Sequence, residues 1–90
     1  MDTQIRKHII FYGQVQGVGF RYRARYEAQA AGVTGWVHNE YDGSVEMEVQ
    51  GTEDAIDRMI LMIEQGPYVR IENLRVKTIP LVSEIGFHIR

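Results

Sequence analysis

The sequence predicts an α+β fold in which two helices cover one face of an antiparallel sheet, the split βαβ arrangement. Three observations support this prediction. Short β-branched and aromatic runs, typical of strands, alternate with two longer segments of helical periodicity. The segment Ser44–Gln50 alternates apolar and polar side chains, as a strand with one buried face does. An Asp42-Gly43 pair between two strand-like segments predicts a hairpin, because hairpin turns require positive φ.

The first part of the chain predicts a strand, a glycine-rich loop and a helix. The strand covers His8–Tyr12, the loop covers Gly13–Gly19, and the helix covers Phe20–Ala31. Gly32 follows this helix and is a residue type that commonly ends helices. Apolar, mostly small residues recur every three or four positions and form one face of the helix: Phe20, Ala24, Ala28 and Ala31.

The middle of the chain predicts a hairpin of two strands followed by a second helix. The strands are Val33–Asn39 and Ser44–Gln50, and residues 40–43 form the turn between them. Thr52 is placed to cap the second helix, and Gly66-Pro67 ends it. The apolar stripe of this helix consists of Ala55, Ile56, Met59, Ile60 and Ile63.

The last part of the chain predicts two further strands. They cover Arg70–Ile79 and Glu84–Arg90, and Pro80 separates them. The predicted order is therefore strand, helix, strand, strand, helix, strand, with one extra strand after it. This order is that of the split βαβ unit.

Length and composition indicate one ordinary globular domain. The 90 residues suit a single domain, which we place at residues 1–90. Hydrophobic residues make up 44% of the chain and charged residues 24%, as in typical globular proteins. The chain has no cysteine, which excludes disulfides, thiolate metal sites and a cysteine nucleophile. No apolar run approaches the roughly 18 residues that a membrane span requires.

The charge balance argues against nucleic-acid binding. The net charge is −2, whereas nucleic-acid binding depends on an excess of Lys and Arg. Residues 1–7 lack the apolar stretch of a secretory signal, so we expect a cytoplasmic protein without membrane or nucleic-acid partners. Arg21, Arg23 and Arg25 nevertheless lie close together, which leaves a local anion site open. We expect Arg23 and Arg25 on a solvated helix surface, with Arg23 paired to Glu27 one turn later.

The loop Gly13–Gly19 is the strongest local indication of chemistry. Its three glycines let backbone N–H groups converge, and the helix N-terminus after it adds unpaired donors, which together attract phosphate. The positive charge of Arg21 in the first helical turn is unfavourable beside the positive end of the helix dipole, unless an anion lies between them. Taken alone, however, a simple turn is the better interpretation of this loop. Its glycine spacing is neither that of a P-loop nor that of a dinucleotide-binding loop.

Asn39 is the second candidate site residue. Period-two alternation places Asn39 on the same face as Val37, toward the helices and at the end of its strand. A polar amide in that position needs a hydrogen-bond partner. Two interpretations stay open: the amide bonds its own turn, which is the simpler one, or it orients a water molecule.

Other polar residues form no recognisable site. His8, His38 and His88 are too scattered for a metal motif, so we expect no metal. Ser44 and Ser83 have no convincing base beside them, which argues against a serine nucleophile.

Two segments resemble those of the acylphosphatase family. The family's signature loop is similar to Gly13-Gln14-Val15-Gln16-Gly17-Val18-Gly19-Phe20-Arg21. Its second motif is similar to Gly35-Trp36-Val37-His38-Asn39, followed by Asp42-Gly43-Ser44-Val45 and Gly51. Both motifs occur in the expected order, and the resemblance extends through nearly the whole chain. Two positions depart from the pattern: Gln14 stands where relatives often carry Arg or Lys, and Gly19 occupies a variable position.

The resemblance implies a ferredoxin-like fold and an enzyme that hydrolyses the carboxyl–phosphate bond of acyl phosphates. It implies no metal and no cofactor. It assigns positioning of the attacking water to Asn39 and phosphate binding to Arg21 and the loop backbone. The loop residues concerned are Gly13, Gln14, Val15, Gln16, Gly17, Val18 and Gly19. The expected partners are a small-molecule acyl phosphate and inorganic phosphate as product and inhibitor, and we expect a monomer.

A regulatory domain that senses a small anion is the alternative function. Such a domain could use the same loop without turning anything over, and a fold alone does not decide between the two. An RNA-recognition domain is disfavoured, because the chain lacks the aromatic run of such domains and is acidic overall.

Overall fold

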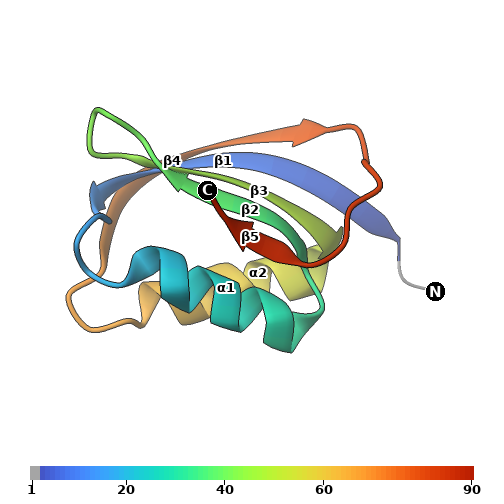
Figure 1. Ribbon diagram of the computed structural model, residues 1–90, viewed down its shortest axis with the longest axis horizontal. Coiled ribbons are helices and arrows are strands. Elements are labelled where there is room, and N and C mark those ends of the chain that lie inside the picture. The colour runs from blue at the N-terminus through green and yellow to red at the C-terminus, as the bar shows by residue number, and fades with distance from the viewer. Residues whose placement is uncertain (1–2) are drawn as a thin grey trace.

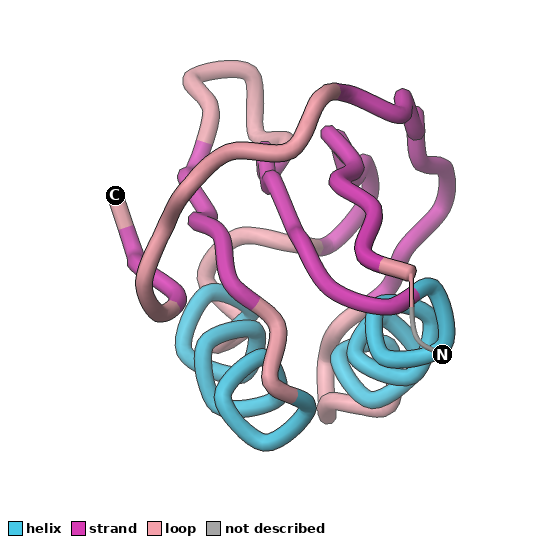
Figure 2. The backbone as a smooth tube through the Cα atoms, turned by 90° about the vertical axis from the view of Figure 1, so that its right-hand side faces the viewer, coloured by secondary structure: helices cyan, strands magenta, loops and turns pink. Residues whose placement is uncertain are grey.

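The computed structural model describes residues 3–90 and confirms the split βαβ arrangement (Figure 1). Met1 and Asp2 belong to the predicted domain of residues 1–90 and to its N-terminal segment, but lie outside the described residues. The two helices lie side by side on one face of the sheet, as both views show (Figure 1, Figure 2). The elements in chain order are β1 (Gln4–Gln14), α1 (Phe20–Ala31), β2 (Thr34–Asn39), β3 (Val45–Thr52), α2 (Glu53–Glu64), β4 (Arg70–Ile79) and β5 (Phe87–Ile89).

The sheet has five strands in the order β4-β1-β3-β2-β5. β1 pairs antiparallel with β3 and β4, and β2 pairs antiparallel with β3, which confirms the predicted hairpin. β5 differs from the prediction, because it pairs parallel with β2, with Gly35 beside Phe87. The physical reason is the connection of residues 80–86. It carries the chain from the β4 edge to the opposite edge, where β5 enters in the direction of β2, so the sheet is mixed.

The core lies between the sheet and the two helices. Both predicted helix faces are confirmed: α1 buries Phe20, Ala24 and Ala28, and α2 buries Ile56, Met59 and Ile63. The small alanines bring α1 close to the sheet. The strands contribute alternate side chains that are fully buried: Ile9, Phe11, Val37, Val45, Met47 and Val49.

The other face of the sheet carries a buried arginine that the sequence analysis did not predict. Arg6 is only 2% exposed. Its Nη2 lies 2.9 Å from Glu48 Oε1 and 3.2 Å from Glu84 Oε2, and its Nη1 donates to Gln50 Oε1 at 3.2 Å. Gln50 also bonds the backbone N–H and carbonyl of Val82. These contacts hold residues 80–86 across the end of the sheet, where the loop arches over the strands in Figure 2.

The Arg6 network predicts a large effect on stability. Arg6→Met should lower the free energy of unfolding by about 3 kcal/mol, because it leaves two largely buried carboxylates without a counter-charge. Urea unfolding followed by circular dichroism measures this loss. Arg58→Met is the matched control, since Arg58 is exposed, and should change stability by less than about 0.5 kcal/mol. A small, equal effect in both variants would contradict a structural role for Arg6.

Candidate active site

The loop between β1 and α1 and the hairpin between β2 and β3 lie at the same end of the molecule (Figure 1). β1 and β2 both pair antiparallel with β3, so they run in the same direction and their carboxyl ends lie at the same end of the sheet, on either side of β3. A hollow of about 160 Å³ lies at this end. It brings together predicted residues from both motifs and adds two that were not predicted, Phe20 and Tyr22. The full lining is Val15, Gly17, Gly19, Phe20, Arg21, Tyr22 and Asn39.

Both ends of the loop are anchored in the core. Val15 is fully buried, and Phe20 is 2% exposed with its ring 5.1 Å from the ring of Phe11. Between these anchors, Gly17 and Gly19 adopt left-handed backbone conformations with φ of 72° and 77°. A side chain at either position would strain that backbone. The loop is therefore short, held at both ends and shaped by glycine between them.

The amides of this loop are free to bind an anion. Within the described residues 15–23, the backbone donates one hydrogen bond to another backbone group, from Arg23 N–H to Gly19 O at 3.0 Å. The N–H groups of residues 16–22 have no such acceptor. Consecutive unpaired amides at the start of a helix make a concave site for an anion.

The N-termini of the two helices differ in how their positive ends are compensated. Thr52 Oγ1 accepts a hydrogen bond from Ala55 N–H at 3.1 Å, and Glu53 and Asp54 occupy the first turn of α2. α1 has no side-chain cap and no acidic residue in its first turn. Arg21 instead adds a cation there, and it forms no salt bridge within residues 3–90. The start of α1 therefore lacks the negative charge that the start of α2 has.

Asn39 ends β2 and lines the same hollow from the opposite side of the loop. Its Oδ1 is buried and has no hydrogen-bond partner among the described residues. The predicted direction of its side chain is consistent with the neighbouring Val37, which is fully buried against the helices. A buried oxygen without a partner requires an explanation, and a bound water or substrate group supplies one.

Gly13 and Gln14 lie in β1 rather than in the loop. They pair with Ile71 and Arg70 of β4, after a shift in register between Tyr12 and Gly13. A side chain at Gly13 would place its Cβ 2.2 Å from the carbonyl oxygen of Arg70, so the close approach of β4 requires glycine here. The predicted loop started at Gly13, but the long β4 extends the pairing of β1, and the loop begins at Val15.

Two further loop residues point elsewhere than into the hollow. Val18 is half-buried and packs against the core cluster. The Gln16 side chain donates hydrogen bonds to backbone carbonyls of the hairpin. In Gln16 and Val18, only the backbone is available to a ligand in the hollow.

The hairpin beside Asn39 is held by hydrogen bonds of its own side chains. Asp42 Oδ1 accepts from Ser44 N–H at 2.9 Å and from Ser44 Oγ–H at 2.6 Å, and these bonds lower the pKa of Asp42. A hydrogen bond to the Glu46 carboxylate raises the pKa of Glu40, and the same bond, together with His8 at 2.6 Å, lowers the pKa of Glu46. The turn that follows Asn39 is therefore closed by its own bonds.

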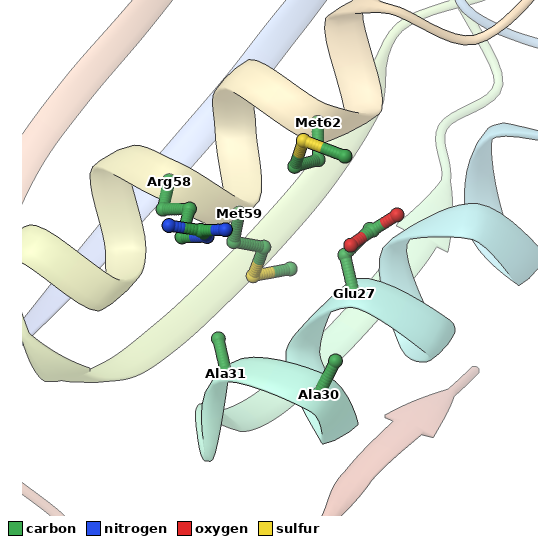
Figure 3. Close-up of a pocket in the computed structure, with 6 residues that line it drawn as sticks. All are labelled: Glu27, Ala30, Ala31, Arg58, Met59 and Met62. Atoms are coloured by element: carbon green, nitrogen blue, oxygen red, sulfur yellow. The ribbon is translucent and has the colours of Figure 1, made fainter.

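A second hollow, of about 190 Å³, lies between the two helices (Figure 3). Its lining is mostly methyl and thioether groups, with one carboxylate and one guanidinium: Glu27, Ala30, Ala31, Arg58, Met59 and Met62. None of the predicted site residues reaches it, and no helix N-terminus opens into it. In residues 3–90, no three His, Asp or Glu side chains are arranged to hold a metal ion.

Arg23 contacts α2, which differs from the expectation for this side chain. Its Nε donates to the carbonyl oxygen of Met62 at 2.8 Å, in the last turn of α2, instead of pairing with Glu27. The side chain is half-buried rather than solvated. A helix C-terminus carries free carbonyls and partial negative charge, so the neighbouring helix competes with the local pairing.

Comparisons with known proteins show which family the chain is similar to. A family model described as Acylphosphatase matches residues 7–89. An acylphosphatase of Bifidobacterium longum (strain NCC 2705) is 43% identical over 81 residues, which cover 89% of this chain and 84% of that protein. An acylphosphatase of Aeropyrum pernix is 45% identical over 92 residues, 99% of this chain and 91% of that protein. The crystal structure of acylphosphatase from Bacillus subtilis superimposes with a TM-score of 0.88 and 34% identity, over 96% of this chain and 98% of that one.

The superposition and the sheet order together define a small α+β protein with the ferredoxin-like fold. The chain belongs to the acylphosphatase family, and its reaction is the hydrolysis of acyl phosphates. Within residues 3–90, no helix has the length and apolar character needed to cross a bilayer.

The Ser44 contacts predict a measurable shift in the titration of Asp42. Ser44→Ala removes the Oγ–H donor, so the pKa of Asp42 should rise toward its ordinary value of 3.8. In the parent protein, the lowered pKa of Asp42 stabilises the folded hairpin at pH values above the pKa that Asp42 has in the unfolded chain. This contribution is lost as the pH falls through the pKa that Asp42 has in the folded protein. A carboxyl-carbon NMR titration measures the midpoint. Ser83→Ala should leave it unchanged, and an unchanged midpoint in Ser44→Ala would contradict the assignment.

Proposed function

We propose that the hollow binds the phosphate group of an acyl phosphate and that Asn39 holds the water molecule that attacks it. One observation carries this proposal: unpartnered amides, an unpaired guanidinium and an unpartnered buried oxygen line one hollow. The donors that the proposal uses are the amides from Val15 to Gly19 and the side chain of Arg21. Gly13 and Gln14 precede them in β1, where their backbone pairs with β4.

The two kinds of donor suit a phosphate dianion. Backbone N–H groups of the loop and the first turn of α1 are fixed in place, so they bind the phosphoryl oxygens without reorganising. The planar guanidinium of Arg21 can hold two of these oxygens at once. The charge of the anion then compensates the start of α1, which has no acidic residue of its own.

Asn39 Oδ1 accepts a hydrogen bond from an O–H of the attacking water, which turns a lone pair of the water oxygen toward phosphorus. The water oxygen forms a new bond to phosphorus while the bond from phosphorus to the acyl oxygen breaks, and the carboxylate leaves with the electron pair. Among residues 3–90, no carboxylate or imidazole lines the hollow. The proton of the water therefore passes to an oxygen of the phosphate itself, and the products are carboxylate and inorganic phosphate.

The reaction proposed here requires no metal ion. A carboxylate is a good leaving group, so no Lewis acid is needed to activate the bond that breaks. Placing water in line with phosphorus and neutralising the phosphoryl charge with fixed donors supply the catalysis.

The assay that tests this function uses the purified protein and benzoyl phosphate with excess EDTA. We expect turnover that EDTA does not change and competitive inhibition by inorganic phosphate, because the product occupies the same donors as the substrate. Release of benzoate, followed by ultraviolet absorbance, measures the rate. Phosphate binding without any turnover would support the alternative of an anion sensor and end the proposal.

Two substitutions separate binding from chemistry at the site. Arg21→Ala should raise KM and lower kcat together, because the guanidinium contacts the phosphate in both ground and transition states. Asn39→Ala should lower kcat by about 10²–10³ with KM little changed, because it affects the water rather than the phosphate. The matched controls are Arg58→Ala and Asn73→Ala, both exposed and outside the lining of the hollow. Turnover like that of the parent in either site variant would refute the role of that residue.

A further inference from the structure

We infer that Gln16 is a positioning residue. Its side-chain amide fixes the phosphate-binding loop, residues 15–19, against the hairpin that carries Asn39. This inference rests on the roles proposed above for the loop and for Asn39. It assigns a separate task to the Gln16 side chain, which does not line the hollow.

The contacts of Gln16 connect two segments that are distant in the sequence. Its Nε2 donates to the carbonyl oxygen of Glu40 at 2.7 Å and to that of Ser44 at 2.9 Å. A side-chain amide has two N–H donors, so both are used. Glu40 directly follows Asn39, and Ser44 directly precedes Val45, the cross-strand partner of Asn39. The amide therefore spans the hairpin at the residues that flank the Asn39–Val45 pair.

The carbonyl of Ser44 also closes the hairpin itself. Glu40 N–H donates to Ser44 O at 2.8 Å, so this oxygen accepts both the hairpin bond and the bond from Gln16. Within residues 3–90, the two Gln16 bonds are the hydrogen bonds that join residues 15–19 to the hairpin of residues 39–45. Together with the buried anchors Val15 and Phe20, they fix the position of the loop relative to Asn39.

This link governs the chemical step more than substrate binding. The phosphorus atom would be held by the loop and the attacking water by Asn39, so the distance between them depends on how the two segments are joined. A misplacement of about 1 Å costs up to about 10²-fold in rate. The loop amides that bind phosphate stay anchored by Val15 and Phe20, both buried, so affinity for phosphate should change little.

The first test is Gln16→Met, which keeps the length of the side chain and removes both donors. We expect kcat on benzoyl phosphate to fall by about 10- to 100-fold, with the inhibition constant of inorganic phosphate within about twofold of the parent. Gln29→Met, on the exposed surface of α1, is the matched control and should behave as the parent. Circular dichroism at the assay temperature gives the folded fraction, and rates are compared per folded molecule. A parent-like kcat in Gln16→Met overturns the inference.

A double-mutant cycle shows whether Gln16 acts through Asn39. In an Asn39→Ala background, Gln16→Met should slow turnover little further, because the group that it positions is absent. Losses that multiply in the double variant would mean independent effects and overturn the inference. If Asn39→Ala is slow while Gln16→Met is not, the inference alone fails. If Asn39→Ala turns over like the parent, the proposed role of Asn39 fails and the inference fails with it.

A second variant gives a pH signature that loss of packing would not produce. In Gln16→Glu, the ionised carboxylate faces two carbonyl oxygens and donates nothing, whereas the protonated carboxyl donates one hydrogen bond. The ratio of kcat in Gln16→Glu to kcat in Gln16→Met should therefore rise as the pH falls toward the ordinary glutamate pKa of about 4.3. A ratio that is constant between pH 7 and pH 4 (roughly the range over which this carboxyl titrates) counts against the proposal.

Discussion

The unpaired amides at the start of α1 are the constraint on which the rest of the site depends. A helix start that is neither capped nor flanked by acidic residues leaves backbone donors without acceptors, and Arg21 adds a cation to them. The core tolerates this arrangement because Val15 and Phe20 anchor both ends of the loop. α2 shows the usual solution, with Thr52 as its cap. The difference between the two helices marks the start of α1 as the candidate anion site.

The direction of the strands brings the second half of the site to these amides. β1 and β2 both pair antiparallel with β3, so their carboxyl ends lie together and Asn39 faces the loop that follows β1. β3 runs in the opposite direction, so it begins rather than ends at this end of the sheet. The split βαβ topology thus brings Asn39 and the loop after β1 to the same end of the sheet, on either side of β3.

The element order and the local features could be predicted from the sequence, whereas several contacts between distant segments could not. The bounds of α1 and the Thr52 cap follow from spacing and residue type over a few positions, and the structure confirms both. The parallel pairing of β5 and the contact of Arg6 with Glu84 depend on where a loop crosses the sheet, which no local pattern encodes. In the site, the two motifs indicated Arg21 and Asn39, whereas the Gln16 bonds to the hairpin join segments that only the fold brings together.

The parallel pairing of β5 has a consequence for how the protein acquires its structure during synthesis. The outer edge of β2 is covered by residues 87–89, which are translated after β2 itself. Until then the nascent chain presents the bare edge of the strand that ends in Asn39, and such edges invite pairing with other chains. Completion of the sheet beside β2 therefore follows translation of this last strand.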